Sequence, residues 1–385
     1  MPPICGIIAE YNPFHNGHLY HIKQAMAASC AEALIVALSG NFVQRGEAAI
    51  IDKFSRTAAA LHGGADMVIE LPLPHATATA EAFALGGCRL LAATNIVDVL
   101  CFGSESDEIA PLYAVAYRLC HESGDFKAAL RQNMARGLSF PAARAAALNA
   151  ADAKIISTPN NILSVEYLKA IIKENLPLQP IAVKRSGADH NASVLSAGIS
   201  SASAIRKHMT EGGSLEALKS LMPPESFRLL CQEHIQNAIN HIDNFSHFFH
   251  YALQNLPKSE LSTAAASNFL ISHIIHAAKT KNRTHAALRR AALEIILKTP
   301  ANLRYAPPPY IRVLGFKRSR RDLLQRLHKS AALPVITNLK HAQSLPPAAK
   351  TFLGLEFAAT KTYWLALKPY GVAERSEFSQ PMVIL

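Results

Sequence analysis

Short apolar runs alternate with amphipathic stretches along the first half of the chain. The runs end at glycine, proline or polar residues, as strands buried on both faces do, and they lie at 4–9, 33–40, 66–72, 97–105 and 178–185. The stretches between them space their apolar residues as helices do, at 18–29, 52–64, 79–94 and from Pro159 onward. This alternation predicts an α/β fold, with a doubly wound parallel sheet covered by helices on both faces. In such sheets, ligands bind beyond the carboxyl ends of the strands.

The residue composition and the hydrophobic pattern change near residue 211. The segment EGGSLEALKSLMPPES is punctuated by glycine and proline, and residues from about 225 to 300 have a helical pattern rich in Ala, Leu and His. We therefore expect two parts. Residues 1–210 would form the α/β domain, and residues 211–385 would form a mainly helical, basic C-terminal region.

The segment EYNPFHNGHLYH (10–21) joins the first expected strand to the first expected helix, and it places His15 and His18 around Asn16-Gly17. A helix N-terminus offers free N–H groups and the positive end of its dipole to a phosphate, and Gly17 lets a ligand approach the backbone closely. Imidazole groups there can stabilise the charge that develops when an α-phosphate is attacked. We predict a nucleotidyl-transfer site with His15 and His18 as catalytic residues. The alternative is a pair of surface histidines.

The segment GISSASAIRKHM (198–209) is a second candidate phosphate site. Ser200, Ser201 and Ser203 start a predicted helix, and Arg206 lies about one turn inside it. Hydroxyl and free N–H groups can cradle an anion, and Arg206 can pair with a β- or γ-phosphate. Taken alone, the segment also fits an ordinary capped helix. Together with the histidine pair, it predicts the opposite wall of a triphosphate site.

Polar or small residues also follow other expected strands. Gly103 ends the fourth strand, where it would let an adenine or a ribose lie against the backbone. Asn160 and Asn161 start a helix, and capping of that helix is the default role for at least one of them. Arg185 ends the fifth strand and is a candidate for phosphate or base contact.

Two segments after the second expected strand allow more than one interpretation. SGNFVQRGE (39–47) supplies Asn41, Gln44 and Arg45 at the same sheet edge, where they can shape the pocket for the group that attacks the phosphate. A solvated loop is the alternative. Lys53 and Arg56 are spaced to share one helix face. They can hold phosphates or form an ordinary charged surface.

The chain of 385 residues has a formal net charge of +11, which favours a polyanionic partner such as nucleic acid or an anionic membrane surface; a soluble protein that is merely basic is the alternative. The stretch 310–329 interleaves Arg and Lys with Tyr310 and Phe316, a mixture that suits phosphate contact and base stacking. We predict that this stretch binds RNA, with KNRTHAALRR (281–290) adding to the basic surface. A solvated charged face is the alternative.

Cysteine usage and hydropathy bear on the compartment. The six cysteines show no CxxC or other metal-ligand spacing, which suits a reducing, cytoplasmic location. The N-terminus has no pattern of a signal peptide, and no run of about 18 apolar residues predicts a membrane span. We expect a cytoplasmic protein without a membrane partner.

The assembled motifs resemble those of the tRNA(Met) cytidine acetate ligase family, within the HxGH nucleotidyltransferase superfamily. The matching stretches lie between residues 9 and 316 and read AEYNPFHNGHLYH, SGNFVQRGE, ADMVIELP, FGSE, PNNIL, SSASAIR and PYIRVLGF. YNPFHNGHLYH combined with VQRGE is specific to the family, whereas HxGH alone is not. Two departures are conservative: SSASAIR has serine where related enzymes often have threonine, and VQRGEAAI has alanine where proline is usual.

The resemblance implies an ATP-dependent ligase. Members of the family activate acetate as acetyl-adenylate, release pyrophosphate, and pass the acetyl group to the wobble cytidine of elongator tRNA(Met), which gives N4-acetylcytidine. It also implies that Gly103, Arg185 and one of Asn160 and Asn161 bind ATP. The strand-turn-helix segment would bind ATP too, through Ile7, Ile8, Ala9, Glu10, Tyr11, Asn12, Pro13, Phe14, His15, Asn16, Gly17, His18, Leu19 and Tyr20.

Partners follow from the same reading. We expect ATP as a substrate, Mg²⁺ with its triphosphate, and acetate and elongator tRNA(Met) as the other substrates. Ser200, Ser201 and Arg206 would complete the ATP site. The C-terminal region would dock the tRNA through its backbone phosphates, at Lys317, Arg318, Arg320 and Arg321.

Two other classes of protein share some of these features. A nucleotidyltransferase that adenylates a small cofactor precursor would leave the C-terminal half without a role. A non-catalytic RNA-binding protein with a relict nucleotide pocket does not need the intact set of His15, Gly17, His18 and Arg206.

Overall fold

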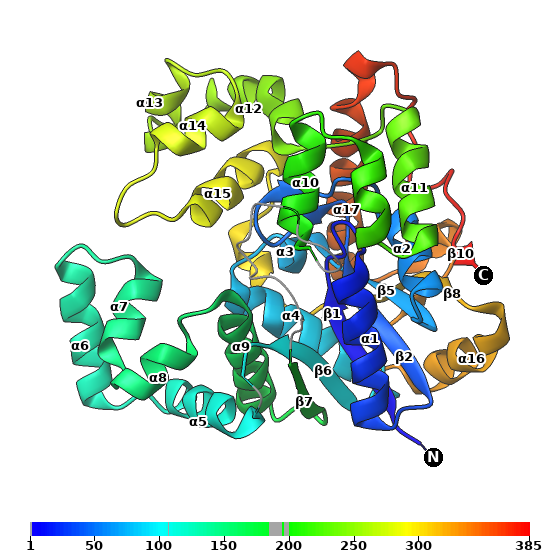
Figure 1. Cartoon of the computed structure of the whole chain (residues 1–385), viewed down its shortest axis with the longest axis horizontal. Coiled ribbons are helices and arrows are strands. Elements are labelled where there is room, and N and C mark those ends of the chain that lie inside the picture. Colours follow the sequence, from blue (N-terminus) through cyan, green and yellow to red (C-terminus); the bar gives the residue numbers. More distant parts are fainter. Residues whose placement is uncertain (1, 107, 185–194, 196–199) are drawn as a thin grey trace.

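A mostly parallel sheet forms the centre of the molecule (Figure 1), and the computed structural model describes residues 2–106, 108–184, 195 and 200–385. The strand order is β10-β8-β5-β2-β1-β6-β7, with β9 beside β8. The strands are β1 (Ile4–Ala9), β2 (Ala33–Ser39), β5 (Met67–Leu71), β6 (Val99–Ser104), β7 (Gln179–Lys184), β8 (Ile311–Phe316), β9 (Val335–Ile336) and β10 (Val383–Ile384). The first five of these are the strands expected from the sequence, and they pair in parallel.

Alternation along these strands gives the sheet two apolar faces. Ile4, Ile35 and Ile69 pack on one face, which is covered by two helices, α4 (Ala80–Ala92) and α9 (Pro159–Glu174). Cys5, Val36 and Val68 point to the other face, which is covered by α1 (Asn16–Ser29) and α2 (Lys53–His62). The prediction of a doubly wound sheet is confirmed.

Strands from the end of the chain complete the sheet. β8 pairs antiparallel with β5, with Phe316 opposite Met67, and β10 pairs with β8. Since β8 runs against the parallel strands, its carboxyl end lies at their amino ends. A boundary at residue 210 therefore separates segments that share one sheet, and the division into two domains stays a prediction.

Two helical lobes extend from the same side of the molecule (Figure 1). The first lobe, which periodicity did not predict, contains α5 (Ile109–Cys120), α6 (Gly124–Ala135), α7 (Phe140–Ala147) and α8 (Ala150–Ile155). The second contains α12 (Ser246–Leu253), α13 (Glu260–Ala265), α14 (Ile271–Ala277) and α15 (His285–Leu297). The remaining α-helices are α3 (Leu73–Ala76), α10 (Ala202–Thr210), α11 (Pro224–Ile235), α16 (Arg321–Ser330) and α17 (Pro347–Leu365).

A buried ion cluster joins the two ends of the chain, and it explains Lys53. The Lys53 ammonium contacts the carboxylates of Glu70 on β5 and Glu377 near the C-terminus, each at 2.5 Å. Arg312 on β8 contacts the same two carboxylates at 2.9 and 2.7 Å. Burial and the nearby Glu70 raise the pKa of a third carboxyl group, Glu356 on α17, to about 8. Two cations thus face two carboxylates, and Glu356 keeps its proton at neutral pH.

Arg56 is also fully buried, so neither interpretation of the Lys53 and Arg56 face was right. The Arg56 guanidinium donates to the backbone carbonyl groups of Glu10 at 2.7 Å, Ser39 at 3.0 Å and Ile51 at 3.1 Å. It therefore ties the carboxyl ends of β1 and β2 together instead of binding phosphate or facing solvent.

Candidate active site

The two predicted histidines cap α1. The backbone N–H of Gly17 donates to Nδ1 of His15 at 3.0 Å, and the backbone N–H of His15 donates to Nδ1 of His18 at 3.3 Å. The two rings stack with their centroids 3.8 Å apart. Because both Nδ1 atoms accept, each neutral ring must carry its proton on Nε2. The proton that each ring can donate to a phosphate is therefore the one on Nε2.

A wedge of aromatic side chains fixes this turn. Tyr11 follows β1 with a positive φ of 47°, and its ring lies 4.8 Å from that of Phe14 and 4.9 Å from that of His18. Tyr11 and Phe14 are buried. Gly63, at the C-terminal end of α2, packs against the Phe14 ring. A Cβ on Gly63 would lie 2.3 Å from that ring, so only glycine leaves room for Phe14 there. Phe14 therefore supports the histidines from the core.

A cavity of about 660 Å³ opens at the carboxyl ends of β1 and β6. It is the expected location for a ligand of a parallel sheet. The predicted residues that line it are Ile7, Ile8, Ala9, Glu10, Tyr11, Asn12, His15, Gly17, His18, Tyr20, Gly103, Asn160, Ser201 and Arg206. Pro13, Phe14, Asn16, Leu19, Asn161 and Ser200 are not among its lining residues, and Arg185 lies outside the described residues.

The two neighbouring asparagines have different surroundings. Asn161 is buried, and its side-chain oxygen accepts from the Ser104 hydroxyl at 2.8 Å and from the Glu105 backbone N–H at 3.0 Å. It holds the end of β6 in place. Asn160 lines the cavity instead. This arrangement favours Asn160 as the asparagine that faces a ligand.

The serine-rich segment lies against the histidine turn. Ser201 caps α10 by accepting from the N–H of Ala204 at 3.1 Å. From this helix, Arg206 donates to the carbonyl group of Asn12 at 2.7 Å and pairs with Glu47 at 2.8 Å. Segments 194 residues apart are thus in direct contact across the cavity.

A short hairpin of β3 (Phe42–Val43) and β4 (Glu47–Ala48) forms a further wall, with Gln44 and Arg45 at its turn. The backbone N–H of Gln44 donates to the Glu10 carboxylate at 2.8 Å, and its side chain donates to the carbonyl group of Ala78 at 3.3 Å. Burial raises the pKa of Glu10, while Arg45 acts against that shift. Burial also lowers the pKa of Arg45, which Glu10 and Glu47 oppose.

Helix α15, from the second lobe, contributes His285, Arg289 and Arg290 to the same cavity. Arg289 forms an ion pair with Glu47 of the hairpin. Gly46 has a φ of 75°, and a Cβ there would lie 2.4 Å from the backbone nitrogen of Arg290. Only glycine permits so close an approach between hairpin and helix.

Sequence reasoning assigned Arg289 and Arg290 to an RNA surface and did not place them beside the histidines. It also missed the apolar wall made by Phe83, Phe102, Leu163 and Tyr167. Both contacts are tertiary, and no local spacing relates these residues to the HxGH motif. Only Gly46, the glycine of VQRGE, could have indicated this contact, because a glycine in a turn permits close approach of another backbone. It could not show that the approaching segment is α15.

The four residues predicted to bind tRNA follow the carboxyl end of β8. They lie at the amino ends of the parallel strands, whereas the cavity opens at the carboxyl ends. Lys317 lies 3.3 Å from the Asp66 carboxylate, and Arg320 donates to the carbonyl group of Glu32 at 2.6 Å. Arg318 and Arg321 are exposed. Contact of Lys317, Arg318, Arg320 and Arg321 with tRNA stays a prediction.

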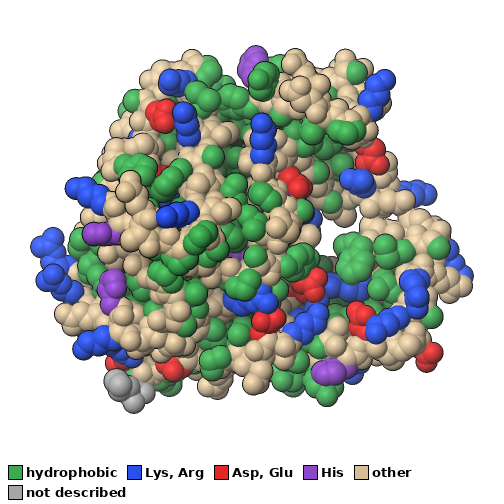
Figure 2. All heavy atoms as spheres, turned by 180° about the vertical axis from the view of Figure 1, so that it is seen from behind, with side chains coloured by type: hydrophobic (Ala, Val, Ile, Leu, Met, Phe, Trp, Pro, Cys, Tyr) green, Lys and Arg blue, Asp and Glu red, His purple; other side chains and the backbone are tan. Residues whose placement is uncertain are grey.

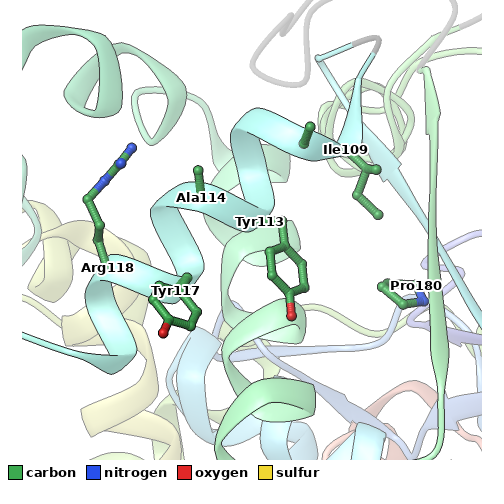
Figure 3. A pocket seen from close by; sticks show the side chains of 7 residues that line it. Ile109, Tyr113, Ala114, Tyr117, Arg118 and Pro180 are labelled. Atoms are coloured by element: carbon green, nitrogen blue, oxygen red, sulfur yellow. The ribbon is translucent and has the colours of Figure 1, made fainter.

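A second cavity of about 500 Å³ lies between α5 and β7 (Figure 3). Tyr113 and Tyr117 leave the same side of α5 and, together with Pro180, form much of its wall, while the Arg118 side chain extends in another direction. None of the predicted site residues lines it. Separately, no helix among the described residues is both long and apolar enough to cross a bilayer.

Comparison with known proteins places this geometry in a family. The profile of the HIGH Nucleotidyl Transferase family matches residues 3–377. The tRNA(Met) cytidine acetate ligase of Acetivibrio thermocellus is 36% identical, over 99% of this chain and 100% of the relative. The enzyme of the same name from Caldanaerobacter subterraneus subsp. tengcongensis is 35% identical, over 99% of each chain.

Solved structures agree with the sequence comparison. Apo Thermotoga maritima TmcAL superposes with a TM-score of 0.93, at 30% identity, over 100% of this chain and 99% of that one. The same protein bound with alpha-thio ATP gives a TM-score of 0.90 at the same identity and coverage. The resemblance found in the motifs is confirmed, and the chain belongs to the tRNA(Met) cytidine acetate ligase family of HIGH nucleotidyl transferases.

Proposed function

We propose that the chain is an ATP-dependent ligase that converts acetate to acetyl-adenylate and transfers the acetyl group to the wobble cytidine of elongator tRNA(Met). An acetate oxygen attacks the α-phosphorus and pyrophosphate leaves. The cytidine N4 amine then attacks the carbonyl carbon, AMP leaves, and the amine loses one proton. The product is N4-acetylcytidine.

The observation that carries this proposal is the histidine cap inside the cavity. Two rings with donor protons on Nε2 stand at the N-terminus of α1, where the helix dipole already favours negative charge. Such donors stabilise charge that grows on the α-phosphate as the acetate oxygen attacks. The rest of the cavity supplies positioning, which is the larger part of catalysis for phosphoryl transfer.

Different walls of the cavity suit the adenine and the phosphates of ATP. On the side of β6 and α9, Phe102, Leu163 and Tyr167 offer apolar surface to adenine, next to Gly103 and Asn160. Arg206 and Ser201 would face the β- and γ-phosphates. Ile7 to Tyr20 would hold ATP along the strand-turn-helix segment, and Arg185, outside the described residues, would add a phosphate contact.

The hairpin side of the cavity suits acetate. Arg45 is the cation at the hairpin turn, beside the carboxyl end of β1, and a guanidinium pairs well with a small carboxylate. Gln44 ties this turn both to Glu10 and to the start of α4. We assign Arg45 to the acetate carboxylate.

Mg²⁺ would accompany the triphosphate. Glu10 is the carboxylate among the lining residues of the cavity, and one of its oxygens already accepts from Gln44. A magnesium ion would therefore be held largely by phosphate oxygens and water, as is usual for nucleotide substrates. It would supply neutralising charge for the leaving pyrophosphate.

One assay tests the proposal against its rivals. The protein is incubated with ATP, labelled acetate and bulk tRNA, and the tRNA is digested to nucleosides. Label in N4-acetylcytidine is the expected result. Transfer of the adenylyl group to a small phosphorylated cofactor precursor would instead support the first rival, and the absence of any turnover would support a binding protein. Either of these outcomes would overturn the proposal.

A further inference from the structure

The second lobe and the residues that flank it carry a net positive charge. Residues 242–304 contain eight Lys or Arg residues and three Asp or Glu residues, a net +5 of the +11 of the whole chain. This lobe borders the cavity through α15. An excess of fixed cations beside a reaction cleft attracts a polyanion from solution.

Five of these eight cations lie within twelve consecutive residues, and we call them the basic track: Lys279, Lys281, Arg283, Arg289 and Arg290. The first three lie in the exposed turn between α14 and α15. The turn ends at the Thr284 cap of α15, and the first turns of that helix bring Arg289 and Arg290 into the cavity. His276 and His285 stack beside the track, with ring centroids 6.2 Å apart.

Few acidic groups neutralise the outer half of the track. Arg283 pairs with Glu260 at 3.2 Å, and both side chains are about half exposed, so this surface pair contributes little. No acidic partner of Lys279 or Lys281 is found in the part of the chain that the structure describes. These cations can therefore meet an incoming phosphate at low cost.

The track also passes the place where the two lobes meet. The Asn282 side chain lies 3.8 Å from the position of a Cβ on Gly137, in the turn that follows α6. Figure 2 shows the surface hollowed between the lobes, with Lys and Arg side chains beside the hollow. A polyanion that enters between the lobes at this point would pass beside the turn that holds Lys279, Lys281 and Arg283.

We propose that the basic track guides the backbone of the tRNA substrate into the cleft. The inference rests on the proposed function, and it names the surface that presents the acceptor cytidine. The outer cations contact backbone phosphates in solvent. Arg290 continues the line of charge at the cavity wall, where the cytidine must reach the acetyl-adenylate. Because phosphates are the contact, the track adds affinity without reading sequence.

The test removes the exposed charges while sparing the cavity wall. Binding of an elongator tRNA(Met) transcript is measured from low to moderate salt for the wild type and for Lys279→Gln/Lys281→Gln/Arg283→Gln. Losing three phosphate contacts should weaken binding and reduce the slope of log affinity against log salt by about 3. The matched control, Lys23→Gln/Lys350→Gln/Lys361→Gln, removes the same charge from exposed sites on α1 and α17 and should keep the wild-type slope.

Unchanged affinity and slope in the track variant would overturn the proposal. An equal loss in the control variant would also overturn it, because the effect would then belong to net charge. Acetate-dependent exchange of pyrophosphate into ATP needs no tRNA and reports separately on the proposed function. A wild-type protein that binds tRNA through the track but shows no such exchange would retain the track and lose the ligase assignment.

Discussion

The backbone N–H of His15 donates to Nδ1 of His18, while the ring of His15 accepts from Gly17. The two side chains therefore act as one unit that closes the helix and fixes both tautomers. Replacing His18 by Ala should lower the rate of acetyl-adenylate formation by about 10²- to 10³-fold, the usual effect of losing one charge-stabilising donor. Acetate-dependent pyrophosphate exchange measures this rate.

Binding of tRNA should survive in His18→Ala, because the ring lies inside the cavity that we propose for ATP. His273→Ala, at an exposed site on α14, is the control and should keep full exchange activity. Full activity of His18→Ala would remove the histidine pair from the mechanism.

Alanine variants of Asn160 and Asn161 should have different defects. Asn160→Ala should raise the KM for ATP with little change in stability, because Asn160 lines the cavity. Asn161→Ala leaves the Ser104 hydroxyl and the Glu105 N–H without their acceptor and should cost about 1–3 kcal/mol of unfolding free energy. Urea unfolding and ATP titration of both variants decide the assignment, and the opposite pattern would reverse it.

Arg45 should control the affinity for acetate. Loss of a charge-assisted contact of about 1.5–3 kcal/mol predicts that Arg45→Ala raises the KM for acetate by roughly 10- to 100-fold. The KM for ATP should stay near the wild-type value, and Arg45→Lys should recover part of the loss. A rise in the KM for ATP alone would place Arg45 at the phosphates instead.

Protonated Glu356 should make the folded protein less stable as pH rises toward 8, the opposite of the usual effect of a carboxyl group. Its pKa is about 8 in the folded protein, against an ordinary value of 4.5, so the folded state holds one more proton than the unfolded state between these limits. The wild type therefore loses stability from this group as pH rises through that window. Glu356→Gln mimics the protonated form and lacks this loss.

The free energy of unfolding of Glu356→Gln, relative to the wild type, should increase by up to about 1.4 kcal/mol per pH unit and level off above the folded pKa. Urea unfolding between pH 5.5 and about 9 measures it. The exposed carboxyl variant Glu374→Gln is the control. Parallel pH profiles for Glu356→Gln and the wild type would refute the protonated state.

Arg318 and Arg321 provide a separate test of tRNA contact at the far edge of the sheet. If both contact backbone phosphates, Arg318→Gln/Arg321→Gln should reduce the salt slope of tRNA binding by about 2. An unchanged slope at low salt would remove this surface from the interface. The result does not depend on the basic track, because the two surfaces lie at opposite ends of the sheet strands.

Local sequence patterns were enough to predict most strands of the nucleotide-binding half and the helices between them. The strand at 4–9, the turn at Asn12 and the helix after His15 all follow from short-range periodicity and capping, and so did the histidine site. Lys53 and Arg56 could not be placed, because helical spacing reports which face they share and not what covers that face. The strand β8 was not predicted, because Arg312 made its sequence resemble an exposed basic segment. Arg312 is buried beside Glu70 and Glu377, which neutralise its charge.

The ion cluster has a consequence for anyone who divides this chain. Cutting after residue 210 would remove Arg312 and Glu377, the second ion partners of Glu70 and Lys53. It would also remove β8, which pairs with β5, so the Lys53–Glu70 pair and the edge of β5 would lose the segments that cover them. The half that holds the histidines should therefore not be obtainable as a minimal enzyme. A working chimera would have to exchange Lys53, Glu70, Arg312, Glu356 and Glu377 together.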